Sequence, residues 1–113
     1  MNKKILIVDD DMSFVNKILD SCPSSRHTYA IADSIKRARY LLSNDSFDII
    51  LANVKVPGGN SIELKSNSNE LKNTSFLFMS NLDSDYDYVN NIGEKCYYKY
   101  DFDKSLKVYL ENV

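Results

Sequence analysis

Short apolar runs alternate with segments of helical periodicity along the chain, and this alternation constrains the fold more than any other feature. Residues 4–8 (KILIV) and 47–52 (FDIILA) are runs of strand length that are rich in apolar residues. Such runs are typical of parallel strands that are buried on both faces. A weaker strand candidate covers residues 28–32, another apolar strand is predicted at 76–79, and a fifth strand candidate covers 96–98.

Apolar residues three and four positions apart predict helices between these strands. The polar segment 61–72 has few apolar anchors and predicts at most a short or irregular helix. We expect Asp33 or Ser34 to cap the second helix and Asp103 to cap the last one. Strict alternation of strands and helices predicts a parallel sheet with helices on both faces. The remaining predicted helices cover residues 14–19, 35–42, 83–91 and 106–113.

The composition fits one globular domain over residues 1–113, with 43% hydrophobic and 27% charged residues and a net charge of −2. This negative balance argues against a nucleic-acid surface, and no apolar run approaches the length of a membrane span. Cys22 and Cys96 form no CxxC motif and predict free thiols in a cytoplasmic protein. The single His27 is expected at the surface or at a strand edge, not as a metal ligand.

Polar residues follow four of the predicted strands. In an open parallel sheet, ligands bind beyond the carboxyl ends of the strands, so these residues are candidates for a site. Clustered carboxylates attract a hard divalent cation such as Mg²⁺, whereas a hydroxyl group and a lysine suit phosphoryl oxygens. The candidates are Asp9, Asp10, Asp11, Asn53, Ser80, and Lys99 or Tyr100.

Four motifs carry a resemblance to a known family: ILIVDDD at 5–11, FDIILANVKVPGG at 47–59, FLFMSN at 76–81 and CYYKYDF at 96–102. Through them the chain resembles the receiver domain of two-component response regulators over nearly its whole length. The resemblance implies a flavodoxin-like (βα)5 fold. This is a three-layer α/β sandwich around a five-stranded parallel sheet with the strand order 2-1-3-4-5.

The resemblance also implies roles for individual residues. Asp9 and Asp10 match the acidic pair that holds Mg²⁺ in the family, together with a backbone carbonyl, here that of Lys55. Ser80 matches the hydroxyl residue that follows the bound phosphoryl group. The family's proline lies four residues beyond its phospho-acceptor and matches Pro57, which places the acceptor position at Asn53.

Asn53 departs from the family pattern because a neutral carboxamide is not a usable nucleophile, whereas an aspartate is. The substitution also removes one negative charge from the cation site. Two unit charges about 4 Å apart interact by about 4 kcal/mol at an effective dielectric constant of 20. We therefore expect no enzymatic activity, no cofactor, and weak Mg²⁺ binding at most.

The fifth strand can be matched to the family's aromatic–x–x–lysine–proline pattern in two ways. A one-residue deletion after Gly93 places Lys99 at the lysine position, Cys96 at the aromatic position and Tyr100 at the proline position. Without the deletion, Tyr97 is the aromatic residue and Tyr100 replaces the lysine. The first arrangement is favoured because a deletion in a loop costs little.

In receivers, partners usually contact the face formed by the fourth helix, fifth strand and fifth helix. Tyrosine is favoured at interfaces because it buries a large area at a small entropy cost. In this chain, that face is expected to include Tyr86, Tyr97, Tyr98 and Tyr109, together with Asp83, Asp85 and Asp87.

These residues favour a phosphorylation-independent signalling and protein-interaction module. The expected partners are a second copy of the chain, a histidine kinase or an output domain, and the chain is expected to be free-standing or the front of a longer, transcriptional regulator. The alternative is a working phospho-receiver that uses another acid, or in which Asn53 is an engineered replacement of a native aspartate. A nucleotide-binding enzyme is disfavoured because the chain lacks a glycine-rich phosphate loop.

Overall fold

A five-stranded parallel sheet forms the centre of the protein in the computed structural model, which describes residues 2–22, 26–66 and 73–113. Within these residues the strand order is β2-β1-β3-β6-β7, which confirms the predicted order 2-1-3-4-5 of the successive sheet strands. Every neighbouring pair in the sheet is parallel. The strands are β1 (Lys3–Val8), β2 (His27–Ala32), β3 (Ile49–Asn53), β6 (Ser75–Ser80) and β7 (Lys95–Tyr98).

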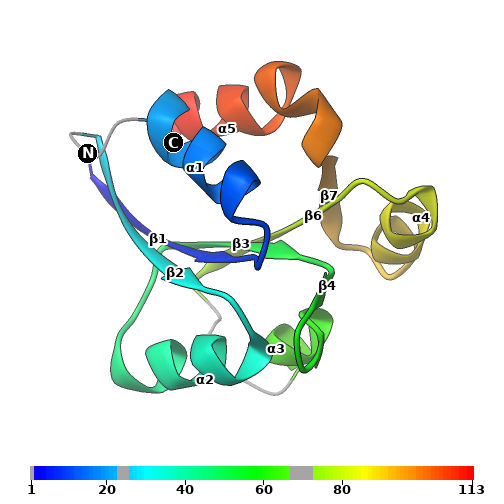
Figure 1. Ribbon diagram of the computed structural model, residues 1–113, viewed down its shortest axis with the longest axis horizontal. Coiled ribbons are helices and arrows are strands. Elements are labelled where there is room, and N and C mark those ends of the chain that lie inside the picture. The colour runs from blue at the N-terminus through cyan, green and yellow to red at the C-terminus, as the bar shows by residue number, and fades with distance from the viewer. Residues whose placement is uncertain (1, 23–25, 67–72) are drawn as a thin grey trace.

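Helices cover both faces of this sheet (Figure 1). One face carries α1 and α5, and the other carries α2, α3 and α4, so the predicted three-layer sandwich is confirmed. A 3₁₀ helix, η2, connects β7 to α5. The helices are α1 (Met12–Ser21), α2 (Ile35–Asn44), α3 (Ile62–Ser66), α4 (Asp83–Asn91), η2 (Lys99–Lys104) and α5 (Leu106–Asn112).

β1 lies inside the sheet, between β2 and β3, and its last four residues are fully buried. Ile5 and Ile7 pack toward α1 and α5, whereas Leu6 and Val8 pack toward the opposite helices. Full burial of a side chain of this size contributes about 1.5–3 kcal/mol. A continuous apolar run is therefore required at this central position, where both faces of the strand are covered.

Residues 57–60 (PGGN) are typical of a turn, and a small antiparallel hairpin forms there from β4 (Lys55–Val56) and β5 (Gly59–Asn60). Gly58 and Gly59 have φ angles of +99° and +148°, which side chains other than glycine rarely allow. The amide of Val54 donates to the carbonyl of Met79 at 3.0 Å and so joins the start of this hairpin to β6. These contacts fix the segment that follows Asn53.

Two sequence predictions about local structure need correction. Asp103 does not cap the last helix, because it lies within η2 and α5 begins after Ser105. His27 is the first residue of the edge strand β2, as one of the two predicted positions has it, but it is fully buried, so the surface alternative is wrong. Its Nδ1 accepts from the Lys3 amide at 3.2 Å and its Nε2 donates to the Leu110 carbonyl at 3.1 Å.

Ser34, one of the two predicted caps of the second helix, accepts a hydrogen bond from the Arg37 amide through its side chain. The third helix is short, as predicted, and residues 67–72 of that segment, including Leu71, lie outside the described residues. In the described ranges, no helix is long and apolar enough to cross a membrane.

Candidate functional site at the carboxyl ends of the strands

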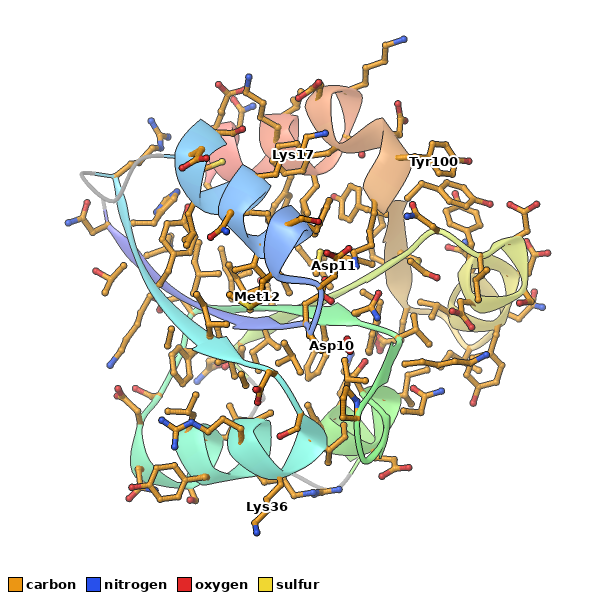
Figure 2. All side chains as sticks on the ribbon, in the orientation of Figure 1. Asp10, Asp11, Met12, Lys17, Lys36 and Tyr100 are labelled. Carbon is orange, nitrogen blue, oxygen red and sulfur yellow. The ribbon has the colours of Figure 1, made fainter. Side chains whose placement is uncertain are left out.

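The parallel strands bring the predicted polar residues to one edge of the sheet. Asp9 follows β1, Asn53 ends β3 and Ser80 ends β6, while Lys99 comes directly after β7. Figure 2 shows Asp10 and Asp11 on the turn that connects β1 to α1, at this same edge. The sheet topology thus creates a single polar edge from four separate parts of the sequence.

Asp9 and Lys99 form a buried ion pair at this edge. The Nζ atom of Lys99 lies 2.7 Å from Oδ2 of Asp9, and the two side chains are 7% and 0% exposed. The contact is a charge pair that lacks the alignment of a hydrogen bond. Nζ also lies 4.8 Å from the centre of the Phe14 ring. Removing one partner from such a pair leaves an uncompensated buried charge, at a cost of about 3–5 kcal/mol.

Asp11 has a structural role as the N-cap of α1. Its Oδ1 accepts from the Ser13 hydroxyl at 2.7 Å and from the Phe14 amide at 3.3 Å. These two bonds lower the pKa of the Asp11 carboxyl group, and the ammonium of Lys99, 3.8 Å from Oδ2, acts in the same direction. Asp10 is exposed, so the three consecutive aspartates occupy three different environments.

Asn53 closes the loop that follows β3. Its Nδ2 donates to the backbone carbonyl of Lys55 at 2.6 Å. In a receiver with an acceptor aspartate, that carboxylate and this carbonyl are both expected to be bound to the cation. Here the side-chain amide of Asn53 is hydrogen-bonded directly to the Lys55 carbonyl.

Ser80 and Asp85 form a second buried polar pair. The Ser80 hydroxyl donates to Oδ2 of Asp85 at 2.8 Å and accepts from the Leu82 amide at 3.0 Å. The ammonium of Lys55 lies 3.6 Å from the other carboxylate oxygen of Asp85. Asp85 is only 7% exposed, so its predicted position on an exposed partner face is wrong. Its link to Ser80 arises because the first turn of α4 folds back over the end of β6.

These residues do not fit a Mg²⁺ ion. Asp9 is neutralised by Lys99, and the carbonyl of Lys55 already accepts a hydrogen bond from Asn53. Over the described part of the chain, no three acidic, histidine or cysteine side chains come together as metal ligands. A cation would therefore have to displace an internal ammonium and an internal amide before it could bind.

At the end of β7, the structure places Lys99 rather than Tyr100 at the polar edge. Tyr100 is 68% exposed, and its backbone amide donates to Oδ1 of Asn81 at 2.9 Å. Cys96, three residues before Lys99, is buried among the residues that pack against α4. The alignment with a one-residue deletion after Gly93 matches Cys96 to the family's aromatic residue, so a small thiol lies at that position.

The four tyrosines predicted on the partner face fall into two separate groups. Tyr86 and Tyr98 stack with ring centres 4.3 Å apart. Tyr97 and Tyr109 instead contact each other on the side of the sheet that is covered by α1 and α5. Adjacent residues of a strand point to opposite faces, and this alternation separates Tyr97 from Tyr98. The prediction missed Tyr100, whose ring stacks on Tyr98 at 4.7 Å.

The sheet order and the helix layers match the fold of solved receiver domains of response regulators. The non-phosphorylated HemR receiver domain from Leptospira biflexa has a TM-score of 0.78 and 21% identity, over 96% of this chain and 91% of that chain. The response regulator TrrA from Thermotoga maritima, solved in complex with Mg²⁺ and BeF, has a TM-score of 0.77 and 15% identity, over 97% of each chain.

A third structure with the same fold is the chemotaxis response regulator CheY4 of Vibrio cholerae. It has a TM-score of 0.75 and 18% identity, over 96% of this chain and 98% of that chain. No protein-family model and no curated protein matches the sequence. At these identities the likeness establishes the fold, and the function must be argued from the residues of the site.

Proposed function

We propose that the chain is a receiver-type module of two-component signalling that binds protein partners without being phosphorylated at the acceptor position. The observation that carries this proposal is the contact between Asn53 and the carbonyl of Lys55, at 2.6 Å. The side chain at the acceptor position is neutral, and its amide group serves as a donor within the loop. It therefore offers no nucleophile to a phosphoryl donor.

The other groups that a phosphoryl ligand would use are also engaged internally. The Ser80 hydroxyl donates to Asp85, and the Lys99 ammonium pairs with Asp9. Both contacts are buried and would have to break before either group could bind a phosphoryl oxygen. Unpaired buried polar groups cost about 1–3 kcal/mol each, and unpaired buried charges cost more. We infer that these contacts hold the polar residues at the carboxyl ends of the strands in one conformation.

Asp9, Asp10 and Asp11 are weak substitutes for the missing acceptor. Asp9 is fully buried against Lys99, and Asp11 caps α1. Asp10 is exposed but would be lost as a member of the acidic pair if it were phosphorylated. These environments support the phosphorylation-independent reading over the alternative of a receiver that uses another acid.

We further propose that partners bind at the face formed by α4, β7 and η2. Tyr86, Tyr98 and Tyr100 stack there and present aromatic area next to α4. The candidate partners are a second copy, a histidine kinase, or an output domain of a longer regulator. A cytoplasmic location is part of the proposal, because Cys22 and Cys96 are free thiols, which remain reduced in that compartment.

Intact-mass measurement after incubation with Mg²⁺ and acetyl phosphate tests the proposal. The wild-type chain is expected to keep its mass. The matched control is Asn53→Asp, which restores the carboxylate nucleophile and is expected to gain one phosphoryl group that is lost on mild base treatment. A stoichiometric phosphoryl adduct on the wild-type chain would overturn the proposal.

A further inference from the structure

Three tyrosine rings form a continuous stack on the side of the protein that carries α4; we call Tyr86, Tyr98 and Tyr100 the tyrosine ladder. The Tyr86 and Tyr98 rings are 4.3 Å apart and inclined by 10°, and the Tyr98 and Tyr100 rings are 4.7 Å apart and inclined by 30°. The rings come from α4, β7 and η2 in turn. Tyr100 is the outermost ring, and Figure 2 shows it at the edge of the molecule near α4.

The surroundings of the ladder are acidic. Residues 82–91 contain no basic residue, and two of their three aspartates, Asp83 and Asp87, are exposed. The third, Asp85, is buried and lies against the Lys55 ammonium. Asp83 accepts from the hydroxyl of Tyr98 at 2.7 Å, and this bond, with smaller contributions from burial and from Asp87, raises the pKa of Tyr98. Lys99 does not offset this charge at the surface, because its side chain turns inward to Asp9.

Stacked rings beside carboxylates form a surface that is complementary to one kind of side chain in particular. The faces of aromatic rings attract cations, and arginine does so more often than lysine. The planar guanidinium group can stack on a ring while donating two parallel hydrogen bonds to a carboxylate, whereas the ammonium group of lysine cannot.

A second copy of the chain is a poor occupant of this face. A symmetric dimer through the ladder would bring Asp83 and Asp87 of one copy close to the same residues of the other. Juxtaposed like charges disfavour such an interface. Nucleic acid is disfavoured for the same reason, because its phosphates are anionic.

We propose that the tyrosine ladder, with Asp83 and Asp87, binds an arginine-bearing peptide segment of a partner protein. This inference rests on the proposed function as an interaction module and adds the chemistry of the partner. It identifies the exposed face of Tyr100 as the platform for a guanidinium group and the two aspartates as its anionic partners. Salt should weaken the binding, because the charges lie at the surface.

The test is a titration of the ¹⁵N-labelled full chain with an acetylated hexa-arginine peptide and, separately, with hexa-lysine, at low and at raised salt. We expect amide shifts in α4, β7 and η2, weaker binding at raised salt, and a preference for the arginine peptide of about two- to fivefold. Tyr100→Ala should abolish this preference, and Asp87→Asn should weaken the binding of both peptides.

The matched control is Tyr40→Ala, which removes another exposed tyrosine, from α2, and should leave both affinities unchanged. Thermal unfolding of each variant checks that it is folded. Equal affinity for the two peptides, an equal loss in Tyr40→Ala, or shifts centred away from the ladder would overturn the inference. Concentration-dependent dimerisation abolished by Tyr100→Ala would overturn it in favour of a second copy. No phosphodonor is present, so this outcome is independent of the phosphorylation test.

Discussion

The carboxamide nitrogen of Asn53 lies 2.6 Å from the carbonyl oxygen of Lys55, and only a donor at position 53 can make this contact. An aspartate there would place a carboxylate oxygen against a carbonyl oxygen, with no hydrogen between them. Such an arrangement needs a cation to hold it together. The amide group of Asn53 thus links position 53 to the Lys55 carbonyl, as a metal ion would in a receiver with an acceptor aspartate.

The buried pair of Lys99 and Asp9 predicts a large loss of stability when one partner is removed. Lys99→Met should lower the free energy of unfolding by about 3–5 kcal/mol, because Asp9 is then buried without a counter-charge. Adding Asp9→Asn should recover part of the loss. Urea unfolding of the single and double variants measures both effects.

The exposed pair of Lys4 and Asp45 provides the control, since its side chains are 40% and 46% exposed. Lys4→Met should change the stability by at most about 1 kcal/mol. A loss in Lys99→Met as small as that in Lys4→Met would contradict the burial of the Lys99 charge.

The hydrogen bond between Ser80 and Asp85 predicts that Ser80→Ala is destabilising. The substitution leaves a buried carboxylate without its hydroxyl donor, at a cost of about 1–3 kcal/mol. Asp87 lies on the exposed side of α4, the helix that carries Asp85, so the free energy of unfolding of Asp87→Ala should stay within about 0.5 kcal/mol of that of the wild type. Thermal or urea unfolding compares the two, and equal effects would show that Asp85 does not hold Ser80.

The contrast between Phe102 and Tyr100 tests whether η2 is anchored to the core. Phe102 is fully buried and packs edge-on against Phe14, with ring centres 5.7 Å apart. Phe102→Ala should cost about 3–5 kcal/mol. Tyr100→Ala, two residues away, should cost much less because the ring is 68% exposed. Chemical unfolding of the two variants measures both costs. Similar losses of stability in Phe102→Ala and Tyr100→Ala would argue against anchoring of η2 to the core.

The thiol of Cys96 predicts a loss of stability at alkaline pH. Burial, and after it the charge of Asp85, raises the pKa of Cys96 from 9.0 to about 11. Between these values the folded chain keeps a proton that the unfolded chain releases. The contribution of Cys96 is therefore complete below pH 9 and is lost as the pH rises toward 11.

Cys96→Ala isolates this contribution. Its unfolding free energy, measured by urea titration, should be lower at neutral pH because of the cavity but should fall less steeply between pH 9 and 11 than that of the wild type. Identical slopes in the two proteins would mean that Cys96 ionises in the folded chain at its ordinary pKa.

Local patterns predict the main strands and helices of the fold. The apolar run of β1 and the helical spacing of α4 each reflect burial along one segment, and burial of this kind leaves a periodic trace in the sequence. The strand order came from the resemblance to receivers and is confirmed. The hairpin of β4 and β5 was predicted only as a turn, because two-residue strands leave no periodic signal.

Contacts between distant segments could not be predicted. Asp85 reads as a surface residue of an acidic helix, and only its position over the end of β6 buries it. His27 is buried because the carbonyl of Leu110, at the other end of the chain, accepts from its ring. The separation of Tyr97 from Tyr98, in contrast, follows from the two-residue period of a strand and was available from the sequence.

The most direct test of the account is the ¹H–¹⁵N spectrum of the full chain during titration with Mg²⁺ and beryllofluoride. The amide signals of Asn53, Ser80 and Lys99 should not move in the wild type, because their side chains are already bound to the Lys55 carbonyl, Asp85 and Asp9, respectively. The same signals should move in Asn53→Asp, which offers a carboxylate to the metal and to beryllium. Saturable shifts at these three residues in the wild-type chain would contradict the central claim that this receiver edge is closed to phosphorylation.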